Sequence, residues 1–389
     1  MGREEIRNPV PLQNRSLGPR VFASQGAPWA PVVDAPRSRP IRTAELGARL
    51  PPNGMVYPLG MHSPEPVSEL PDRAQIIEGL VRLISGWGGG SAPELRALIA
   101  PAVERMSPDE LLEMAVRSRE TGSHWGYHPP DPFARGLSRQ VMARVLLDGS
   151  EVQGASVLEL ARESRVVLVG NHLSYVDVNV LDHLCDQAGH GDRMERLAVI
   201  VGPKVYTEPI RRLASLCFGT IKTPQSSSLA SGEAVMSPRE VARVARTTLD
   251  VARLRVEAGD LLLLFPEGAR SRSASMRACL PAIARYLEIP DLWIVPFAHT
   301  GCERLVPLEE DHVYPERVSF RLGSPIRAER LLERTRRSRG CTADVLGFWI
   351  ADLLPEEYRG HYAGPTEGLE EAHEIAGDLL KQRDPEGLG

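Results

Sequence analysis

The sequence of 389 residues contains no long hydrophobic run, since no stretch approaches the roughly 20 apolar residues of a membrane-spanning helix. Its first residues, MGREEIRNPV, lack the apolar core of a secretory signal peptide. The five cysteines are odd in number, scattered and without a C-x-x-C pair, which predicts free thiols and neither a disulfide framework nor a zinc site. A formal net charge of -5 disfavours a general nucleic-acid binder. These absences predict a cytoplasmic protein, for which peripheral membrane contact stays open.

The N-terminal part of the chain divides into two segments. Residues 1–72 are rich in Pro, Arg, Gly and Ser and show no sustained period of 2 or 3.6, which predicts a disordered leader. From Ala74 onward, apolar residues follow the spacing of one helical face, and two Ser-x-x-Glu patterns, at 91–94 and 107–110, each indicate a further helix start. We therefore expect a small helical region over 73–135, acting as a packing or interaction appendage.

Residues 136–330 alternate between apolar runs and helical patterns. The runs that predict buried strands are SRVVLVG (164–170), RLAVIVGPK (196–204), FGTIKT (218–223), DLLLLFPEG (260–268) and LWIVPFAHTG (292–301). ARVLLDGSEV (143–152) suggests another strand and turn, and a long helix is expected from Ser237 to Gly259. This pattern predicts an α/β domain with a mixed central sheet flanked by helices. Residues 331–389 return to helical patterns and are expected to form a C-terminal extension.

The segment NHLSYVD, residues 171–177, directly follows the first of these strands. His172 and Asp177 are five residues apart, which fits neither a helical nor a strand spacing, so only a turn could bring them together. Imidazole suits general-base work near neutral pH, and a carboxylate on its other ring nitrogen fixes the tautomer. Whether Ser174 could act as a nucleophile stays open. Without one, the base would activate a hydroxyl of the substrate for direct transfer.

Two other interpretations of this pair stay open from its residues alone. A histidine and an aspartate near a strand end commonly form a hydrogen-bonded pair with no catalytic role. A metal site needs three or four ligands, and no spaced set of partners lies nearby, so we expect none.

Two more strand ends carry charged residues. After the strand at 260–265, Gly268 lets the backbone pass close to a ligand, and Arg270 and Arg272 present guanidinium groups suited to phosphate oxygens. Glu267 is expected to be held ionised by these cations and to position an arginine or accept a substrate hydroxyl. Lys222 ends the strand at 218–223.

Together these segments resemble the glycerolipid acyltransferase family that includes 1-acylglycerol-3-phosphate acyltransferase, the PlsC-like enzymes. The family is marked, in order, by four segments, which here read NHLSYVD (171–177), GTIKT (219–223), FPEGARSR (265–272) and IVPFAHTG (294–301). The resemblance covers about half of the chain and implies the glycerolipid acyltransferase fold. It also implies acyl transfer from acyl-CoA or acyl carrier protein, as co-substrate without a further cofactor, to a lysophospholipid hydroxyl.

The resemblance also implies roles for residues of this chain. His172 becomes the base and Asp177 its partner, while the basic segment and the F-P-E-G-x-R segment bind the acceptor phosphate. The implied substrate-binding residues are Asn171, Ser174, Lys222, Glu267, Gly268, Arg270 and Arg272.

Three departures from the family pattern keep alternatives open. Ala269 stands where the family more often has threonine, Lys222 replaces the usual arginine, and no membrane-embedding helices precede the domain. The acceptor could therefore be glycerol-3-phosphate or a non-phosphate alcohol. A non-catalytic lipid-binding relative and a thioesterase are the alternatives of other classes.

Overall fold

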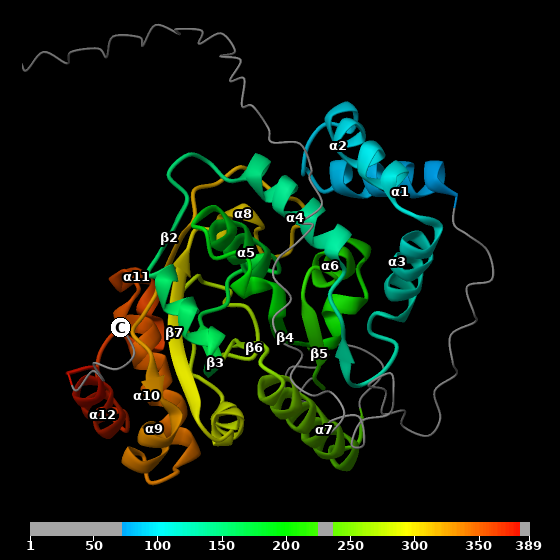
Figure 1. Cartoon of the computed structure of the whole chain (residues 1–389). Coiled ribbons are helices and arrows are strands. Elements are labelled where there is room, and N and C mark those ends of the chain that lie inside the picture. Colours follow the sequence, from blue (N-terminus) through cyan, green and yellow to red (C-terminus); the bar gives the residue numbers. More distant parts are fainter. Residues whose placement is uncertain (1–71, 225–235, 382–389) are drawn as a thin grey trace, which may run out of the picture. The chain divides into compact units, whose positions relative to one another are not determined.

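The computed structural model describes residues 72–224 and 236–381, and the predicted leader over 1–72 lies outside them apart from Asp72. A mixed sheet of nine strands forms the centre, which confirms the predicted fold class (Figure 1). Its order is β1-β5-β4-β6-β3-β7-β8-β2, with β9 also paired to β7. The strands are β1 (Tyr127–His128), β2 (Glu151–Gln153), β3 (Arg165–Gly170), β4 (Leu197–Val201), β5 (Gly219–Lys222), β6 (Leu261–Leu264), β7 (Leu292–Thr300), β8 (Ser319–Leu322) and β9 (Ile326–Arg327).

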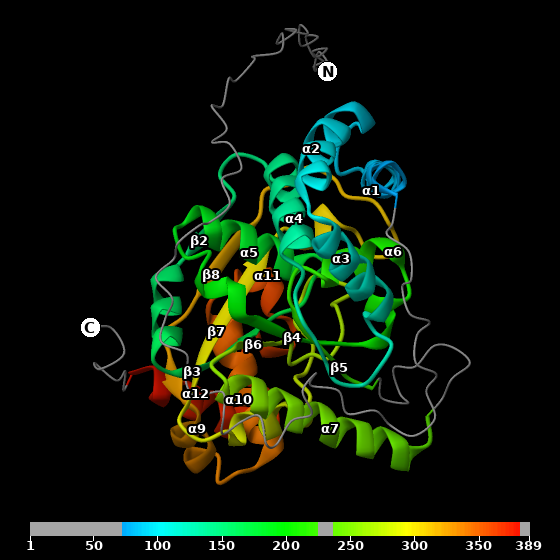
Figure 2. The same ribbon diagram turned by 45° about the vertical axis from the view of Figure 1, so that its right-hand side comes forward.

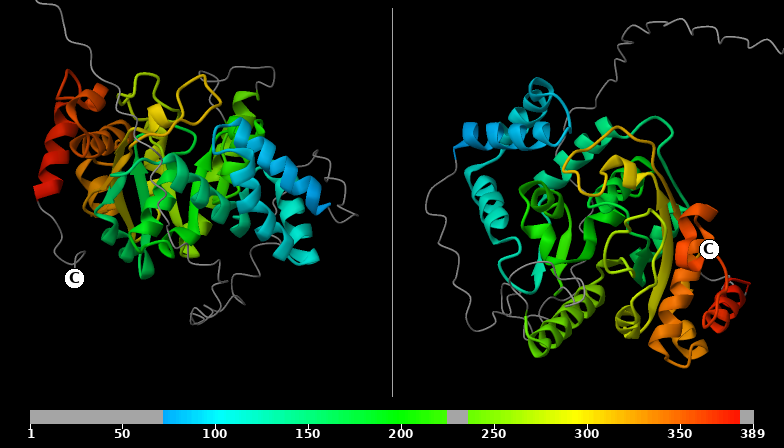
Figure 3. Two further views of the ribbon diagram at one scale, coloured as in Figure 1. Left: turned by 90° about the horizontal axis from the view of Figure 1, so that it is seen from above. Right: turned by 180° about the vertical axis from the view of Figure 1, so that it is seen from behind.

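Helices cover both faces of this sheet and continue beyond its two edges. The first helices of the chain (blue to cyan) and the last (orange to red) lie on opposite sides of the sheet, with α9 and α10 packed on β7 (Figures 1 and 3). The helices are α1 (Arg73–Gly86), α2 (Ala92–Arg105), α3 (Pro108–Glu120), α4 (Pro132–Val145), α5 (Asp177–Gln187), α6 (Pro209–Ser215), α7 (Pro238–Glu257), α8 (Cys302–Leu305), α9 (Ala328–Arg334), α10 (Arg339–Asp352), α11 (Glu356–Arg359) and α12 (Glu370–Lys381).

The central strands are buried on both faces because their apolar side chains alternate between two cores. In β3, Val166 and Leu168 point to the core that α4, α5 and α6 cover, whereas Val167 and Val169 point to the core of α7 and α10. The parallel neighbours β6 and β7 alternate in the same way. Continuous apolar runs are typical of strands enclosed in this manner. The runs that predicted strands from 164 onward are therefore all found in the sheet.

The helical starts follow their local signals. Ser91, Ser107 and Ser237 each begin a helix with a reciprocal serine–glutamate capping box, as the Ser-x-x-Glu spacing indicated. The apolar face of α1 buries Ile77, Val81 and Ile84 against the core shared with α4. Figure 2 shows α1–α3 beside α4 and α6. The helical region thus packs on the sheet domain.

One predicted strand is wrong in part. The segment 143–152 was expected to be a strand and a turn, but its first three residues end α4, and the strand β2 begins only at Glu151. Asp131 caps α4 through the backbone N–H of Ala134, and Pro132 occupies the first helical turn. The helix that starts there runs to Val145. The apolar residues Val141, Met142 and Val145 therefore belong to one face of this helix and not to a strand. The predicted boundary at residue 136 falls inside α4.

Two further observations concern the chain as a whole. No helix among the described residues combines the length and the apolar character needed to cross a bilayer. All five cysteines are free thiols, and four of them are buried. The predicted domain boundaries otherwise stay a prediction.

Candidate active site

The carboxyl ends of three neighbouring parallel strands bring the predicted segments together. In the sheet, β3 lies between β6 and β7. Past the strand ends, the Ser271 amide donates to the His172 carbonyl at 2.8 Å, and the His172 amide donates to the Glu267 carboxylate at 3.1 Å. The NHLSYVD and FPEGARSR segments, about 90 residues apart in the chain, therefore form one surface. Ligands of open α/β sheets bind in such positions.

His172 and Asp177 form the hydrogen-bonded pair that their spacing suggested. Asp177 is the first residue of α5, and the turn before it folds back so that His172 Nδ1 lies 2.8 Å from Asp177 Oδ2. The same oxygen accepts the Leu173 amide at 2.9 Å. Phe265 stacks on the imidazole with a 4.0 Å centroid separation. Because Nδ1 is bound to the carboxylate, Nε2 is the ring nitrogen left for a substrate; it makes no hydrogen bond to the described residues.

Burial and neighbouring groups set the protonation of this pair. Burial is the main influence on His172 and lowers its pKa, while the bond to Asp177 acts in the opposite direction. Burial by itself raises the pKa of Asp177, but the field of His299 and the hydrogen bonds from both histidines lower it well below its usual range. The side chain of His172 is 18% exposed and that of Asp177 is 1% exposed. The pair is thus a neutral imidazole on an ionised carboxylate near neutral pH.

Glu267 is buried and its carboxylate faces the backbone of neighbouring loops. Burial raises the pKa of its carboxyl, whereas the bonds from the Arg277 and His172 amides and the charge of Arg277 act in the opposite direction. Its two oxygens accept the backbone amides of His172 and Arg277, at 3.1 and 2.9 Å. Gly268 has a φ of 69°, a left-handed conformation that glycine adopts most readily. Glu267 therefore holds the His172 loop, and its carboxylate is not open to a substrate hydroxyl.

Asn171 and Ser174 are also buried and engaged within the protein. The Asn171 side chain donates to the His299 carbonyl and accepts the His299 amide, both at 2.9 Å. The Ser174 hydroxyl accepts the Val176 amide at 3.3 Å and has no exposed surface. Ser174 is therefore not placed as a nucleophile, and Asn171 extends the pairing of β3 with β7 past the strand end.

Two arginines meet on one tyrosine of the loop. The guanidinium carbon of Arg270 lies 3.6 Å from the centroid of the Tyr175 ring, and that of Arg211 lies 4.1 Å from it. Arg211, from α6, also pairs with Asp311 at 2.6 Å. Arg270 has no carboxylate partner among the described residues, whereas Arg272 is exposed. Arg211 could not be found from local sequence signals, because it is 59 positions from Arg270 and lies within an ordinary helical pattern.

Lys222 lies apart from this group. Its strand β5 is separated from β3 by β4 and β6. The Lys222 ammonium donates to the Gly122 carbonyl at 2.7 Å and lies over the rings of Trp125 and Tyr206. Burial lowers its pKa. The structure therefore does not bring Lys222 to the His172 loop.

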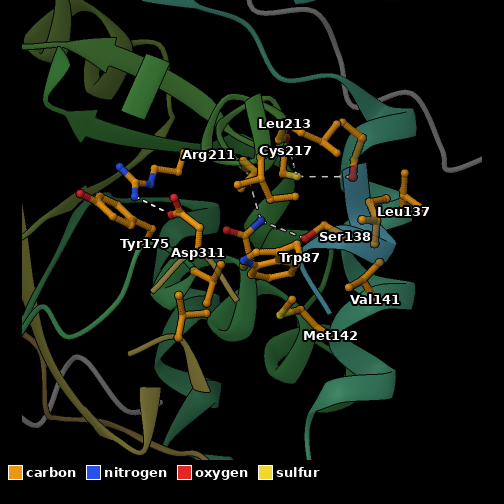
Figure 4. A pocket seen from close by; sticks show the side chains of 17 residues that line it. Trp87, Leu137, Ser138, Val141, Met142, Tyr175, Arg211, Leu213, Cys217 and Asp311 are labelled. Atoms are coloured by element: carbon orange, nitrogen blue, oxygen red, sulfur yellow. Dashed lines mark hydrogen bonds and ion pairs between the residues drawn. The ribbon is translucent and has the colours of Figure 1, made fainter. Parts of the chain in front are cut away.

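An apolar pocket begins beside the same loop. It measures about 610 Å³ including its open side and is bounded by α1, α4, α5 and α6. Figure 4 shows Tyr175, Arg211 and Asp311 on one side and Leu137 and Val141 on the other. The remaining labelled lining residues are Trp87, Ser138, Met142, Leu213 and Cys217. The pocket thus has an arginine at one side and an apolar interior.

A buried cluster adjoins Asp177 on the β7 side. Asp177, His299 and Cys302 place potential metal-ligand atoms within 4.8 Å of one another. However, all three residues are buried, only three potential ligands gather there, and Asp177 already holds His172 Nδ1 and the Leu173 amide. We therefore assign no metal-binding role to these three residues. His299 was not singled out from the sequence, since it reads as one more residue of an apolar strand.

Comparisons with known proteins agree with the motifs. A family model described as Acyltransferase matches residues 150–300, which include the NHLSYVD, GTIKT and FPEGARSR segments. No curated protein matches the sequence. Among solved structures, the 1-acyl-sn-glycerophosphate acyltransferase PlsC from Thermotoga maritima is similar, with a TM-score of 0.38 and 13% identity. That match covers 66% of this chain and 86% of that chain. The family model supports the resemblance of residues 150–300 to acyltransferases.

Proposed function

From the premise that residues 150–300 form an acyltransferase domain, we propose that the protein acylates a lysophospholipid. The donor is the thioester of acyl-CoA or acyl carrier protein, and the acceptor is a free hydroxyl, in particular that of 1-acylglycerol-3-phosphate. His172 is the general base and Asp177 its partner. The observation that carries this proposal is the 2.8 Å bond between them, with Nε2 open at a strand end of an acyltransferase domain.

The pair supports direct transfer without a covalent enzyme intermediate. His172 Nε2 takes the proton of the acceptor hydroxyl, and the oxygen attacks the thioester carbonyl carbon. The ester bond forms, the carbon–sulfur bond breaks, and the leaving thiolate takes the proton from the imidazolium. Asp177 stabilises that imidazolium between the two steps. The buried position of Ser174 argues against a serine ester as an intermediate.

Arg270 and Arg211 favour an acceptor that carries a phosphate. Both guanidinium groups contact Tyr175, three residues from His172 in the same loop. In glycerol phosphates, the reacting hydroxyl and the phosphate are only a few bonds apart, so both must bind near the base. Guanidinium groups engage phosphate oxygens through paired N–H donors. We assign Arg270 the principal contact, because Arg211 already pairs with Asp311.

The apolar pocket suits the acyl chain of the donor. Its wall includes Tyr175 and Val176, so a chain inside it would have its carbonyl end at the His172 loop. Replacing Val141 by Trp should fill the far side. We expect this change to lower turnover of long-chain donors about tenfold while short-chain donors react as before. Equal loss for every chain length would place the acyl chain elsewhere.

The direct test is an acyl-transfer assay with the purified full chain. Labelled acyl-CoA and acyl carrier protein thioesters are offered with 1-acylglycerol-3-phosphate, glycerol-3-phosphate, monoacylglycerol or water alone, and products are identified by mass spectrometry. We expect an ester product with the first acceptor, absent in His172→Ala. Preference for glycerol-3-phosphate or monoacylglycerol would redirect the acceptor assignment. Release of free fatty acid alone would indicate a thioesterase, and no product with any donor would overturn the proposal.

A further inference from the structure

A second histidine, His299, contacts Asp177 and the peptide carbonyl that precedes His172. It lies near the end of β7 and is 1% exposed. Its Nε2 is 2.9 Å from the Asn171 carbonyl, the peptide group that leads directly into His172. The same nitrogen lies 3.4 Å from Asp177 Oδ2, the oxygen that His172 Nδ1 also contacts.

These contacts determine which nitrogen of His299 carries its proton. A peptide carbonyl only accepts hydrogen bonds, so Nε2 must be the protonated nitrogen. The other nitrogen, Nδ1, is buried and has no partner among the described residues, which agrees with an unprotonated lone pair there. The ring stacks on Phe320 with a 4.5 Å centroid separation. The Nε2–H of His299 is thus a fixed donor that points at the Asn171 carbonyl and at Asp177.

We propose that His299 is a positioning residue, whose Nε2–H holds the Asn171 carbonyl and the Asp177 carboxylate and so fixes the geometry of His172. The inference rests on the proposed function and deepens it. The two points that it holds are the backbone before the base and the carboxylate that orients the base. Small displacements of either point would misplace Nε2 of His172 relative to the acceptor hydroxyl. Misplacement by about 1 Å can reduce a rate about 10²-fold.

The groups that face His299 define its effect on pH dependence. They are Asp177, His172, Glu267 and the Cys302 thiol. Without the His299 donor, the Asp177 carboxylate would be a stronger acceptor for His172. The His172 imidazolium would then form more readily, and the acid limb of the kcat/KM profile would move to higher pH.

Two substitutions separate the hydrogen bond from the packing. His299→Phe keeps a ring against Phe320 but cannot donate, whereas His299→Gln loses the ring but places an amide N–H near the position of Nε2. We expect His299→Phe to lower kcat about ten- to a hundredfold with both KM values changed less than about threefold, and to shift the acid limb upward. We expect His299→Gln to keep its rate within about tenfold of the native value and its acid limb in place.

The opposite ranking would overturn the inference, because a merely structural role favours the apolar ring over the amide. The inference would also be overturned if His299→Phe were as active as the native protein. A third measurement needs neither variant nor turnover: nitrogen NMR of the imidazoles in the native protein should show His299 as the Nε2–H tautomer. A proton on Nδ1 would overturn the inference even if acyl transfer is found. Conversely, the Nε2–H tautomer in a protein without transferase activity would overturn only the proposed function.

Discussion

The carboxyl ends of β6 and β5 both present a cation, yet the two cations are used in different ways. At the end of β6, Arg270 lies against Tyr175 and has no carboxylate partner among the described residues. At the end of β5, Lys222 donates to the Gly122 carbonyl and is covered by Trp125 and Tyr206. The first cation remains available for a ligand anion, and the second is part of the packing of the helical region.

The comparison shows that position at a strand end is insufficient evidence for a binding role. What matters is whether the donors of the side chain already have acceptors within the protein. Glu267 makes the same point for an acid, because its oxygens hold two backbone amides. We therefore expect substitutions at the β3 and β6 ends to alter the reaction, and a substitution at the β5 end to alter stability.

The largest effect should come from the base at the end of β3. His172→Ala should lower kcat about 10²-fold or more, and Asp177→Asn should be comparably severe, because the amide can leave the imidazole in the wrong tautomer. Steady-state kinetics measure both, with His361→Ala, an exposed histidine, as the matched control. A folded His172→Ala protein with near-native turnover would contradict the assignment.

The next effect should be on acceptor binding at the end of β6. A charged hydrogen bond contributes roughly 1.5 to 3 kcal/mol, so Arg270→Ala should raise the KM of the acceptor about ten- to a hundredfold. Arg270→Lys should restore only part of the lost acceptor affinity, since an ammonium lacks the planar fork of N–H donors that a guanidinium has. Arg285→Ala, which removes an exposed arginine with no assigned role, serves as the control and should change the KM less than about threefold. A rise in the donor KM instead would place Arg270 on the phosphates of CoA.

A smaller effect on activity is expected at the end of β5. Lys222→Met keeps an unbranched side chain that is one atom shorter and removes the bond to the Gly122 carbonyl. The thermal midpoint should therefore fall by a few degrees, corresponding to about 1 kcal/mol. The KM of the acceptor should change less than about threefold. Differential scanning calorimetry and kinetics on one preparation test both statements. A tenfold rise in the acceptor KM of Lys222→Met at unchanged stability would contradict this prediction, because Lys222 would then bind the acceptor as Arg270 is proposed to do.

The smallest effect concerns pH. Burial lowers the pKa of His172 from its ordinary value near 6.5, and the base works in its unprotonated form. Activity is therefore lost as pH falls through this lowered pKa, and kcat/KM at pH 6.5 should still exceed half of its plateau. Circular dichroism across the same pH range controls for unfolding. A half-maximal rate above pH 6.5 would show that the carboxylate outweighs burial.

Local signals were sufficient for much of the fold and for the central pair. The capping patterns at Ser91, Ser107 and Ser237 depend on residues three positions apart, so they are visible in the sequence. The turn between His172 and Asp177 is equally local. At 143–152, the apolar run was compatible with both a strand and the end of a helix, and the Asp-Pro start of α4 decided between them.

The remaining features depend on contacts between distant segments. His299 reaches Asn171 across 128 residues, and Arg211 and Arg270 meet only through Tyr175. The role of Glu267 as a holder of the His172 loop was equally hidden, since its burial and its two amide donors come from the folded arrangement. No periodicity or short motif carries that information.

The pairing of β1 with β5 has a consequence for the aggregation of truncated variants. Tyr127 and His128 pair with Ile221 and Thr220 and so cover the outer edge of β5. A fragment that began at residue 136 would leave that edge with unpaired backbone groups. Exposed edges of this kind recruit strands from other molecules and promote aggregation. We therefore expect fragments that retain residues 73–135, and with them β1, to aggregate less than one that begins at residue 136.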